Sequence, residues 1–260
     1  MSSLTFGFGP VEAEFWRWLF VMTRVGAALL AAPFFGAAHV PVQARVIVAG
    51  AISILVCGWT TVAAPAALFT LPGMLAAMGE VLIGLSLGFV LQVAFAAPTI
   101  AAEVIGAGMG MSIATAADPN TGAHSPALGQ YFGVVLTLTF LALGGHLLFV
   151  RLLLESYATF PPGHTWLGAE RFSAIATYGG TMLLTALAIA LPVTLVLLLV
   201  QMAAGLLSRA APSLNLFSLG LPAGILAGLG ALIVSAPLLP EVLGELTADA
   251  LTHAEAVIAR

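Results

Sequence analysis

The chain has 260 residues, of which 61% are hydrophobic and only 7% charged, and its formal net charge at pH 7 is -4. Soluble domains usually carry about a quarter charged residues, so this composition excludes an ordinary soluble protein. The basic residues are all arginines, seven in number and scattered, which excludes a polybasic patch, and we expect no nucleic-acid partner.

Five long segments contain no acidic or basic residue, and they cover 46–79, 81–102, 119–150, 172–208 and 210–240. A helix needs about 20 apolar residues to cross the hydrocarbon core of a bilayer, and each segment is long enough. We therefore predict an all-α integral membrane protein that contacts membrane lipid. The first residues carry Glu12 and Glu14 instead of a basic stretch, so we expect them to belong to the mature chain and not to a signal peptide.

We predict six long hydrophobic helices, near 15–32, 42–62, 72–97, 128–156, 172–207 and 216–236. Proline removes a backbone donor and crowds the preceding turn, so Pro98 should end the third helix and Pro192 should kink the fifth. The acidic tail, 237–260, is expected to form a short amphipathic helix. Its charged side is either a solvated face, as charge runs usually are, or a docking surface for a partner.

Several charges lie within or beside apolar segments, where a charge must face protein or water. For Arg17 we expect the side chain to reach back to the membrane surface. For Arg24 and Glu80 we expect burial in a larger assembly, and Glu103 and Arg45 are further candidates for the same role.

Glycines at four-residue spacing occur twice. Gly84 and Gly88 form one pair, and Gly220, Gly224 and Gly228 form a longer run. This spacing is typical of faces through which two helices approach closely. The partner helix can belong to the same chain or to another subunit.

The stretch from 106 to 122 interrupts the hydrophobic pattern. It begins with alternating glycine and methionine, at Gly106, Gly108, Met109, Gly110 and Met111. Each glycine costs about 1 kcal/mol relative to alanine in a helix, which predicts that the helix fails here. Asp118 before Pro119, followed by Thr121 and Gly122, then indicates a tight turn.

Two interpretations of this stretch remain open on physical grounds. It is a plain loop at the membrane surface, or it is buried in protein, where non-helical backbone is tolerated at membrane depth. In the second case Met109, Met111 and Ile113 would supply a compliant apolar seal, because methionine is flexible and adapts to varied surroundings.

A second turn lies between the first two predicted helices. Pro33, Gly36 and Pro41, together with Arg45, indicate a rigid connection. It is either an interface with a neighbouring subunit or a simple link between helices.

No pattern of catalytic or metal-ligating residues is present, so we predict neither an enzyme nor a cofactor. The five histidines are single, and Asp118 has no second carboxylate with which to share a proton. A small-solute or ion transporter is the alternative function, with the break at 106–122 as its site and Glu80 or Glu103 coupling protons. No second broken helix in a corresponding half supports it.

A resemblance to a known family is carried by four segments, 24–46, 80–89, 108–130 and 140–146. Together they resemble the flagellar biosynthetic protein FliR family, which includes the corresponding subunit of virulence type III secretion systems. The resemblance implies a subunit of the export gate in the bacterial inner membrane, assembled with FliP and FliQ and joined by FlhB. The gate would be a channel for unfolded export substrates.

The same resemblance implies an organisation of the chain. Residues 1–171 would form a FliP-like helical part, 172–236 a FliQ-like helical hairpin and 237–260 an acidic C-terminal tail. The loop at 106–122 would help to plug the closed channel. The assembly can sit partly above the membrane on the periplasmic side, so that six hydrophobic helices need not be six crossings. The sequence of residues 118–130 favours a flagellar member of the family.

Overall fold

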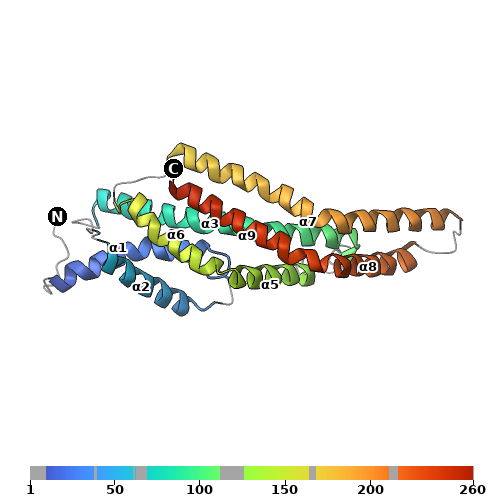
Figure 1. Ribbon diagram of the computed structural model, residues 1–260, viewed down its shortest axis with the longest axis horizontal. Coiled ribbons are helices and arrows are strands. Elements are labelled where there is room, and N and C mark those ends of the chain that lie inside the picture. Colours follow the sequence, from blue (N-terminus) through green and yellow to red (C-terminus); the bar gives the residue numbers. More distant parts are fainter. Residues whose placement is uncertain are drawn as a thin grey trace. The chain divides into compact units, whose positions relative to one another are not determined.

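The computed structural model describes residues 10–37, 40–60, 62, 69–111, 126–163, 168–210 and 216–259. Within these ranges the chain forms helices and turns and no strand, which confirms the all-α prediction. The helices are α1 (Pro10–Ala31), α2 (Val42–Trp59), α3 (Leu71–Gly108), α5 (Pro126–Ala142), α6 (Gly145–Thr159), α7 (Ala169–Ala210), α8 (Leu216–Ser235), the 3₁₀ turn η1 (Ala236–Leu238) and α9 (Leu239–Ala259) (Figure 1).

The helices pack as two compact units. Unit 1 comprises Met1–Val93, Gly144–Gly179 and Asp249–Arg260, and unit 2 comprises Ala94–Leu143 and Gly180–Ala248. Three helices, α3, α7 and α9, therefore contribute residues to both units. This division by packing cuts across the division at 171 and 236, which remains a prediction.

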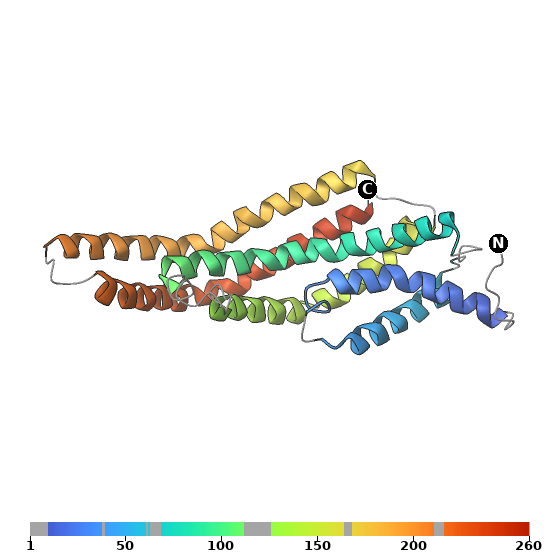
Figure 2. The ribbon, with the colours of Figure 1, turned by 180° about the vertical axis from the view of Figure 1, so that it is seen from behind.

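Unit 1 is built on α1, which packs beside α2 (Figures 1 and 2). The buried residues of α1 include Phe20, Val21, Arg24, Val25, Ala28 and Leu29. Spacings of one, three and four residues put them on one helix face. The first half of α3 adds Ile83, Leu87 and Leu91 to the same core.

Unit 2 joins the second half of α3 to α5, α7 and α8. Phe132, Leu136 and Phe140 are buried at four-residue spacing on α5, and the rings of Phe95 and Phe140 meet edge to face at 5.5 Å. The second half of α7 and α8 run side by side in opposite directions (Figures 1 and 2). Unit 2 therefore contains a helical hairpin.

Four described helical stretches are long and apolar enough to cross a membrane: Val42–Trp59, Leu71–Gly108, Ala169–Ala210 and Gly220–Val257. The pair α5 and α6 makes a fifth if both belong to one span. Fewer crossings are available than the six predicted hydrophobic helices because α1 carries four charged residues, Glu12, Glu14, Arg17 and Arg24.

Two helix boundaries differ from the prediction. α3 continues through Pro98 to Gly108 and so includes Gly106. Backbone groups released from a helix in an apolar setting find no water, so the helix persists where its sequence favours a break. In contrast, the helix predicted over 128–156 is two helices, which are separated at Leu143 and Gly144.

Gly144 explains the second difference. Its φ is 71°, in the left-handed region that glycine adopts without a steric penalty. Its carbonyl oxygen accepts bonds from the N–H groups of Leu147 and Leu148 at 2.9 and 3.1 Å, which starts α6.

The tail has the amphipathic character predicted for it. On α9 the buried side chains include Leu243, Leu246, Ala250, Ala254 and Val257. Its acidic residues Glu241, Glu245, Asp249 and Glu255 are exposed. One face of the helix thus completes the packing, and the charged face is open to solvent or to a partner.

Candidate functional site

The end of α3 contains the described part of the predicted interruption. Gly106 and Gly108 are helical, and the turn begins at Met109 and Gly110. The N–H of Met109 still bonds to the carbonyl of Ile105 at 2.9 Å. Gly110 has a φ of 79°, the left-handed conformation that commonly ends helices at glycine. The break therefore starts three residues later than predicted, because packing outweighs the low helix propensity of glycine.

Met109 is only 2% exposed, whereas Met111 is half-buried. The rest of the predicted plug loop, Ile113, Asp118, Pro119, Thr121 and Gly122, lies outside the described residues. Their role as a seal and anchor remains a prediction.

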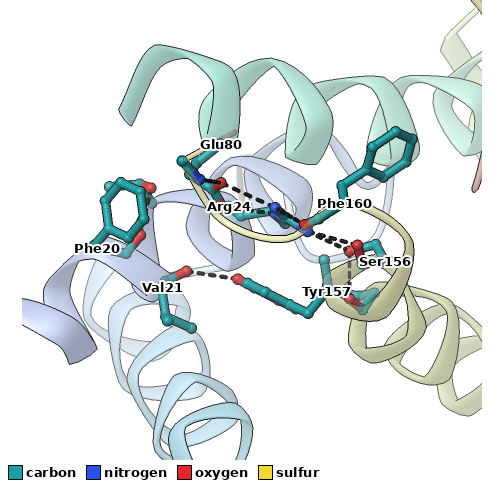
Figure 3. A network of polar contacts seen from close by, with 10 residues as sticks. Phe20, Val21, Arg24, Glu80, Ser156, Tyr157 and Phe160 are labelled. Atoms are coloured by element: carbon teal, nitrogen blue, oxygen red, sulfur yellow. Dashed lines mark hydrogen bonds and ion pairs between the residues drawn. The ribbon is translucent and has the colours of Figure 1, made fainter. Parts of the chain in front are cut away.

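Arg24 and Glu80 form a buried ion pair between α1 and α3 (Figure 3). The Nε of Arg24 donates to Oε2 of Glu80 at 2.7 Å and its Nη2 donates to Oε1 at 3.0 Å. The two side chains are 0% and 2% exposed. This two-bond geometry is needed to offset the desolvation free energy of two buried charges. Each of the two residues finds its partner within the same chain.

The remaining donors of Arg24 bind the C-terminal end of α6. Its Nη1 donates to the backbone oxygen of Ser156 at 2.9 Å and to its Oγ at 3.2 Å, and its Nη2 donates to the backbone oxygen of Phe160 at 2.8 Å. All five N–H groups of the guanidinium therefore have an acceptor. A cation at a helix C-terminus is also favoured by the helix dipole. One side chain thus joins α1, α3 and α6.

Tyr157 completes this cluster (Figure 3). Its ring lies under the guanidinium carbon of Arg24 at 4.1 Å, and its hydroxyl donates to the backbone oxygen of Val21 at 2.8 Å. Glu80 accepts one further bond, from the N–H of Gly163 at 3.3 Å. The sequence did not identify Ser156 or Tyr157, because nothing in its pattern shows which carbonyls a buried arginine will reach.

Gly84 and Gly88 bring α3 against α1. A Cβ added at Gly84 would lie 3.0 Å from the Cβ of Ala27, and one at Gly88 would lie 2.6 Å from the backbone oxygen of Ala28. Real side chains do not approach backbone oxygens so closely. The close approach lets Glu80, one turn before Gly84, reach Arg24.

The turn after α1 is held by backbone and arginine bonds. The N–H of Gly36 bonds to the oxygen of Ala32 at 2.7 Å. Nη2 of Arg45 donates to the oxygens of Ala37 and Val40 at 2.6 and 3.0 Å. Pro33 and Gly36 also line a surface hollow of about 320 Å³ with Phe89 of α3. Pro41 is exposed and immediately precedes α2.

Two predicted charges behave differently. Glu103 is exposed on α3, so the chain alone does not bury it. Arg17 donates to the backbone oxygens of Cys57, at 2.8 Å, and Thr60, and its side chain is 19% exposed; its expected position at the membrane surface remains a prediction. These oxygens are at the C-terminal end of α2, which Arg17 caps.

Sequence reasoning also missed Gln201. Its side-chain Nε2 donates to the backbone oxygen of Gly108 at 2.7 Å, one of the carbonyls that a helix end leaves without an intrahelical partner. An amide side chain within the uncharged run 172–208 was the available signal.

The apolar spans and the charge pair inside the helix packing define an integral membrane protein of helical bundles. The family model for bacterial export proteins, family 1, matches residues 15–250. The flagellar biosynthetic protein FliR of Escherichia coli (strain K12) is 33% identical over 234 residues, 88% of this chain and 89% of that protein. FliR of Bacillus subtilis (strain 168) is 34% identical over 219 residues, 83% of this chain and 84% of that protein.

A relative with a different name covers less of the chain. The secretion system apparatus protein SsaT of Salmonella typhimurium is 31% identical over 160 residues, 61% of this chain and 62% of that protein. The chain belongs to the FliR family of bacterial export proteins. It is a membrane-embedded component of a type III protein-export apparatus.

Proposed function

We propose that the chain is a subunit of the flagellar export gate in the bacterial inner membrane. It assembles with FliP-like and FliQ-like subunits, is joined by an FlhB-like subunit and forms with them a gated channel for unfolded flagellar proteins. The observation that carries this proposal is the match to bacterial export proteins through residues 15–250, nearly the whole chain.

The surface of α7 supports an assembly of several subunits. Many of its large apolar side chains are exposed, among them Leu183, Leu184, Leu187, Leu195, Leu199, Leu206 and Leu207. Exposed apolar side chains in such number mark contact with protein or with lipid. A helix hairpin that contacts like hairpins of other subunits would cover it, as expected of a FliQ-like part at 172–236.

Glu103 supports the same proposal. Its carboxylate is exposed on an apolar helix that is long enough to cross a membrane. In contact with lipid such a charge is costly, so it faces a partner or water. A channel assembly offers both surroundings.

Within this gate, residues 106–122 would contribute to the plug of the closed channel. Met109, Met111 and Ile113 would supply its apolar contacts, and the turn through Asp118, Pro119, Thr121 and Gly122 would anchor it. The complex would sit partly above the membrane plane on the periplasmic side.

Deleting the chromosomal copy of this gene and supplying the tagged chain from a plasmid tests the proposal. We expect the deletion to stop secretion of flagellar proteins into the medium and the plasmid to restore it. A deletion strain that secretes flagellar proteins normally would overturn the proposal. Substrate-dependent uptake of a small solute by the purified chain alone would support the transporter alternative instead.

A further inference from the structure

The C-terminal end of α3 is held by two other helices of unit 2. Three consecutive residues, Gly108, Met109 and Gly110, each contact α7 or α8. Gly108 is the last residue of α3, and Met109 and Gly110 form the turn that follows it. Their contacts fix the position of the C-terminal end of α3.

Met109 makes the largest of these contacts. A Cβ added at Gly228 of α8 would lie 2.6 Å from Cγ of Met109, and one at Gly224 would lie 3.4 Å from its backbone oxygen. The thioether therefore occupies a slot on α8 that exists only because residue 228 has no side chain. Met109 is 2% exposed there.

Gly108 and Gly110, on either side of Met109, contact α7 and α8 respectively. A Cβ added at Gly108 would lie 3.0 Å from Cδ1 of Leu197 on α7, and one added at Gly110 would lie 2.8 Å from Cδ2 of Leu221 on α8. The amide of Gln201 donates to the carbonyl of Gly108 at 2.7 Å. Among the described residues, the other contacts of this attachment are apolar.

We propose that these contacts form a latch, which we define by its residues: Gly108, Met109 and Gly110, held by Leu197, Gln201, Leu221 and Gly228. The inference rests on the proposed function: the latch is engaged in the closed gate and releases when the channel passes a substrate. Methionine is unbranched and flexible, so its side chain can leave the glycine slot without displacing the backbone of α8. Gly110 is the residue after which the direction of the chain can change, because glycine adopts varied backbone conformations.

The chemistry of the latch suits reversible release. It consists of one long side chain, one amide hydrogen bond and close packing against glycine, with no ion pair. Packed elements with two discrete arrangements are the usual units of such transitions. A glycine slot at position 228, filled by a flexible side chain, is suited to release and is not required for a permanent attachment.

A disulfide across the latch tests it in cells that lack their own copy of the protein. The positions of Cβ at Gly108 and of Leu197 Cβ are 3.9 Å apart, within the roughly 3.5–4.5 Å that disulfides require. Gly108 is helical, and replacing Leu197 removes the Cδ1 that would crowd the new side chain. The full-length variant is Gly108→Cys with Leu197→Cys in a Cys57→Ser background.

We expect the oxidised double variant to assemble but to stop exporting flagellar proteins, and a reductant to restore export. Each single cysteine variant should export equally under oxidising and reducing conditions, because neither can form the cross-link. Export by the cross-linked protein at the unmodified rate would overturn the latch, and so would failure of the pair to cross-link in the assembled apparatus.

Gly228→Ala tests the latch in the opposite direction and does not depend on the cysteines. The added methyl expels Met109 from its slot, so we expect several-fold more ion leakage through the closed gate. Gly230→Ala is the matched control on the same helix, because a Cβ there meets nothing within 4 Å. Equal leakage in the two variants would contradict the latch. The unmodified chain in the same cells separates the two proposals: if it does not restore export, the proposed function itself fails.

Discussion

Arg24 of α1 and Glu80 of α3 bind each other through two hydrogen bonds, of 2.7 and 3.0 Å, inside unit 1 of this FliR-family chain. The two residues are 56 positions apart in the sequence, and both are buried. The pair is complete within one subunit, so neither charge depends on another subunit for its partner. It also fixes where α6 ends, because Arg24 binds two carbonyl oxygens there.

Replacing Arg24 by methionine should strongly destabilise the protein. Glu80 would remain buried without its partner, and breaking a buried pair from one side costs about 3–5 kcal/mol. The double variant with Glu80→Met should be less destabilised than Arg24→Met alone, because no unpaired charge remains. Unfolding of the purified protein in detergent measures both effects.

Arg151→Ala provides the control for this prediction. Arg151 pairs with Glu155 at 2.7 Å, but its side chain is 72% exposed. Solvent screens such pairs, and we expect little change in stability. Equal destabilisation by Arg151→Ala and Arg24→Met would refute the special role of the buried pair.

Gly88→Ala should push α3 away from α1. The new methyl would lie 2.6 Å from the backbone oxygen of Ala28, and overpacking of this kind typically costs about 1–3 kcal/mol. Gly26→Ala on α1 has open space for its methyl and should be neutral or stabilise the helix by up to about 1 kcal/mol. Unfolding in detergent compares the two. A neutral Gly88→Ala would mean that the close approach of the helices is not required.

Arg45→Ala should loosen the turn after α1. The carbonyls of Ala37 and Val40 would lose their charged donor, and a hydrogen bond to a charged group contributes about 1.5–3 kcal/mol. If the turn is an interface with a neighbouring subunit, less FliP-like protein should co-purify with the variant. Arg209→Ala, at an exposed position in the last turn of α7, should leave co-purification unchanged. An undiminished yield from Arg45→Ala would favour a simple helix connection.

Met111→Ser should raise ion leakage through the closed gate several-fold if the methionines after α3 seal the channel. A serine is shorter and polar, so it cannot maintain an apolar contact with the channel wall. Met202→Ser, at a site 58% exposed on α7, is the comparison. Conductance of the reconstituted complex measures both, and equal conductance would remove Met111 from the seal.

The hydrophobic pattern predicted the helices well because burial in lipid or protein depends on composition over many residues. It failed at single residues whose effect depends on surroundings. Pro98 and Gly106 were expected to stop α3, but neither does, because a broken helix in an apolar setting leaves backbone groups without partners. Gly144 produces a real break, and only its backbone conformation distinguishes it from the glycines inside helices.

The candidate site shows the same limit. That Arg24 and Glu80 need protein surroundings follows from the cost of a charge in an apolar segment. That they meet each other does not follow, because their contact depends on the helix crossing at Gly84 and Gly88. Gln201 was overlooked for a related reason: its acceptor is a backbone carbonyl at a helix end, and the predicted end of α3 was misplaced.

Purification of the tagged chain from membranes in mild detergent tests the central claim most directly. The account predicts that FliP-like and FliQ-like proteins leave the membrane with it as one stable complex, and that the complex persists through size-exclusion chromatography. Recovery of the chain as a stable monomer, from cells that secrete flagellar proteins normally, would contradict the claim that it is a gate subunit.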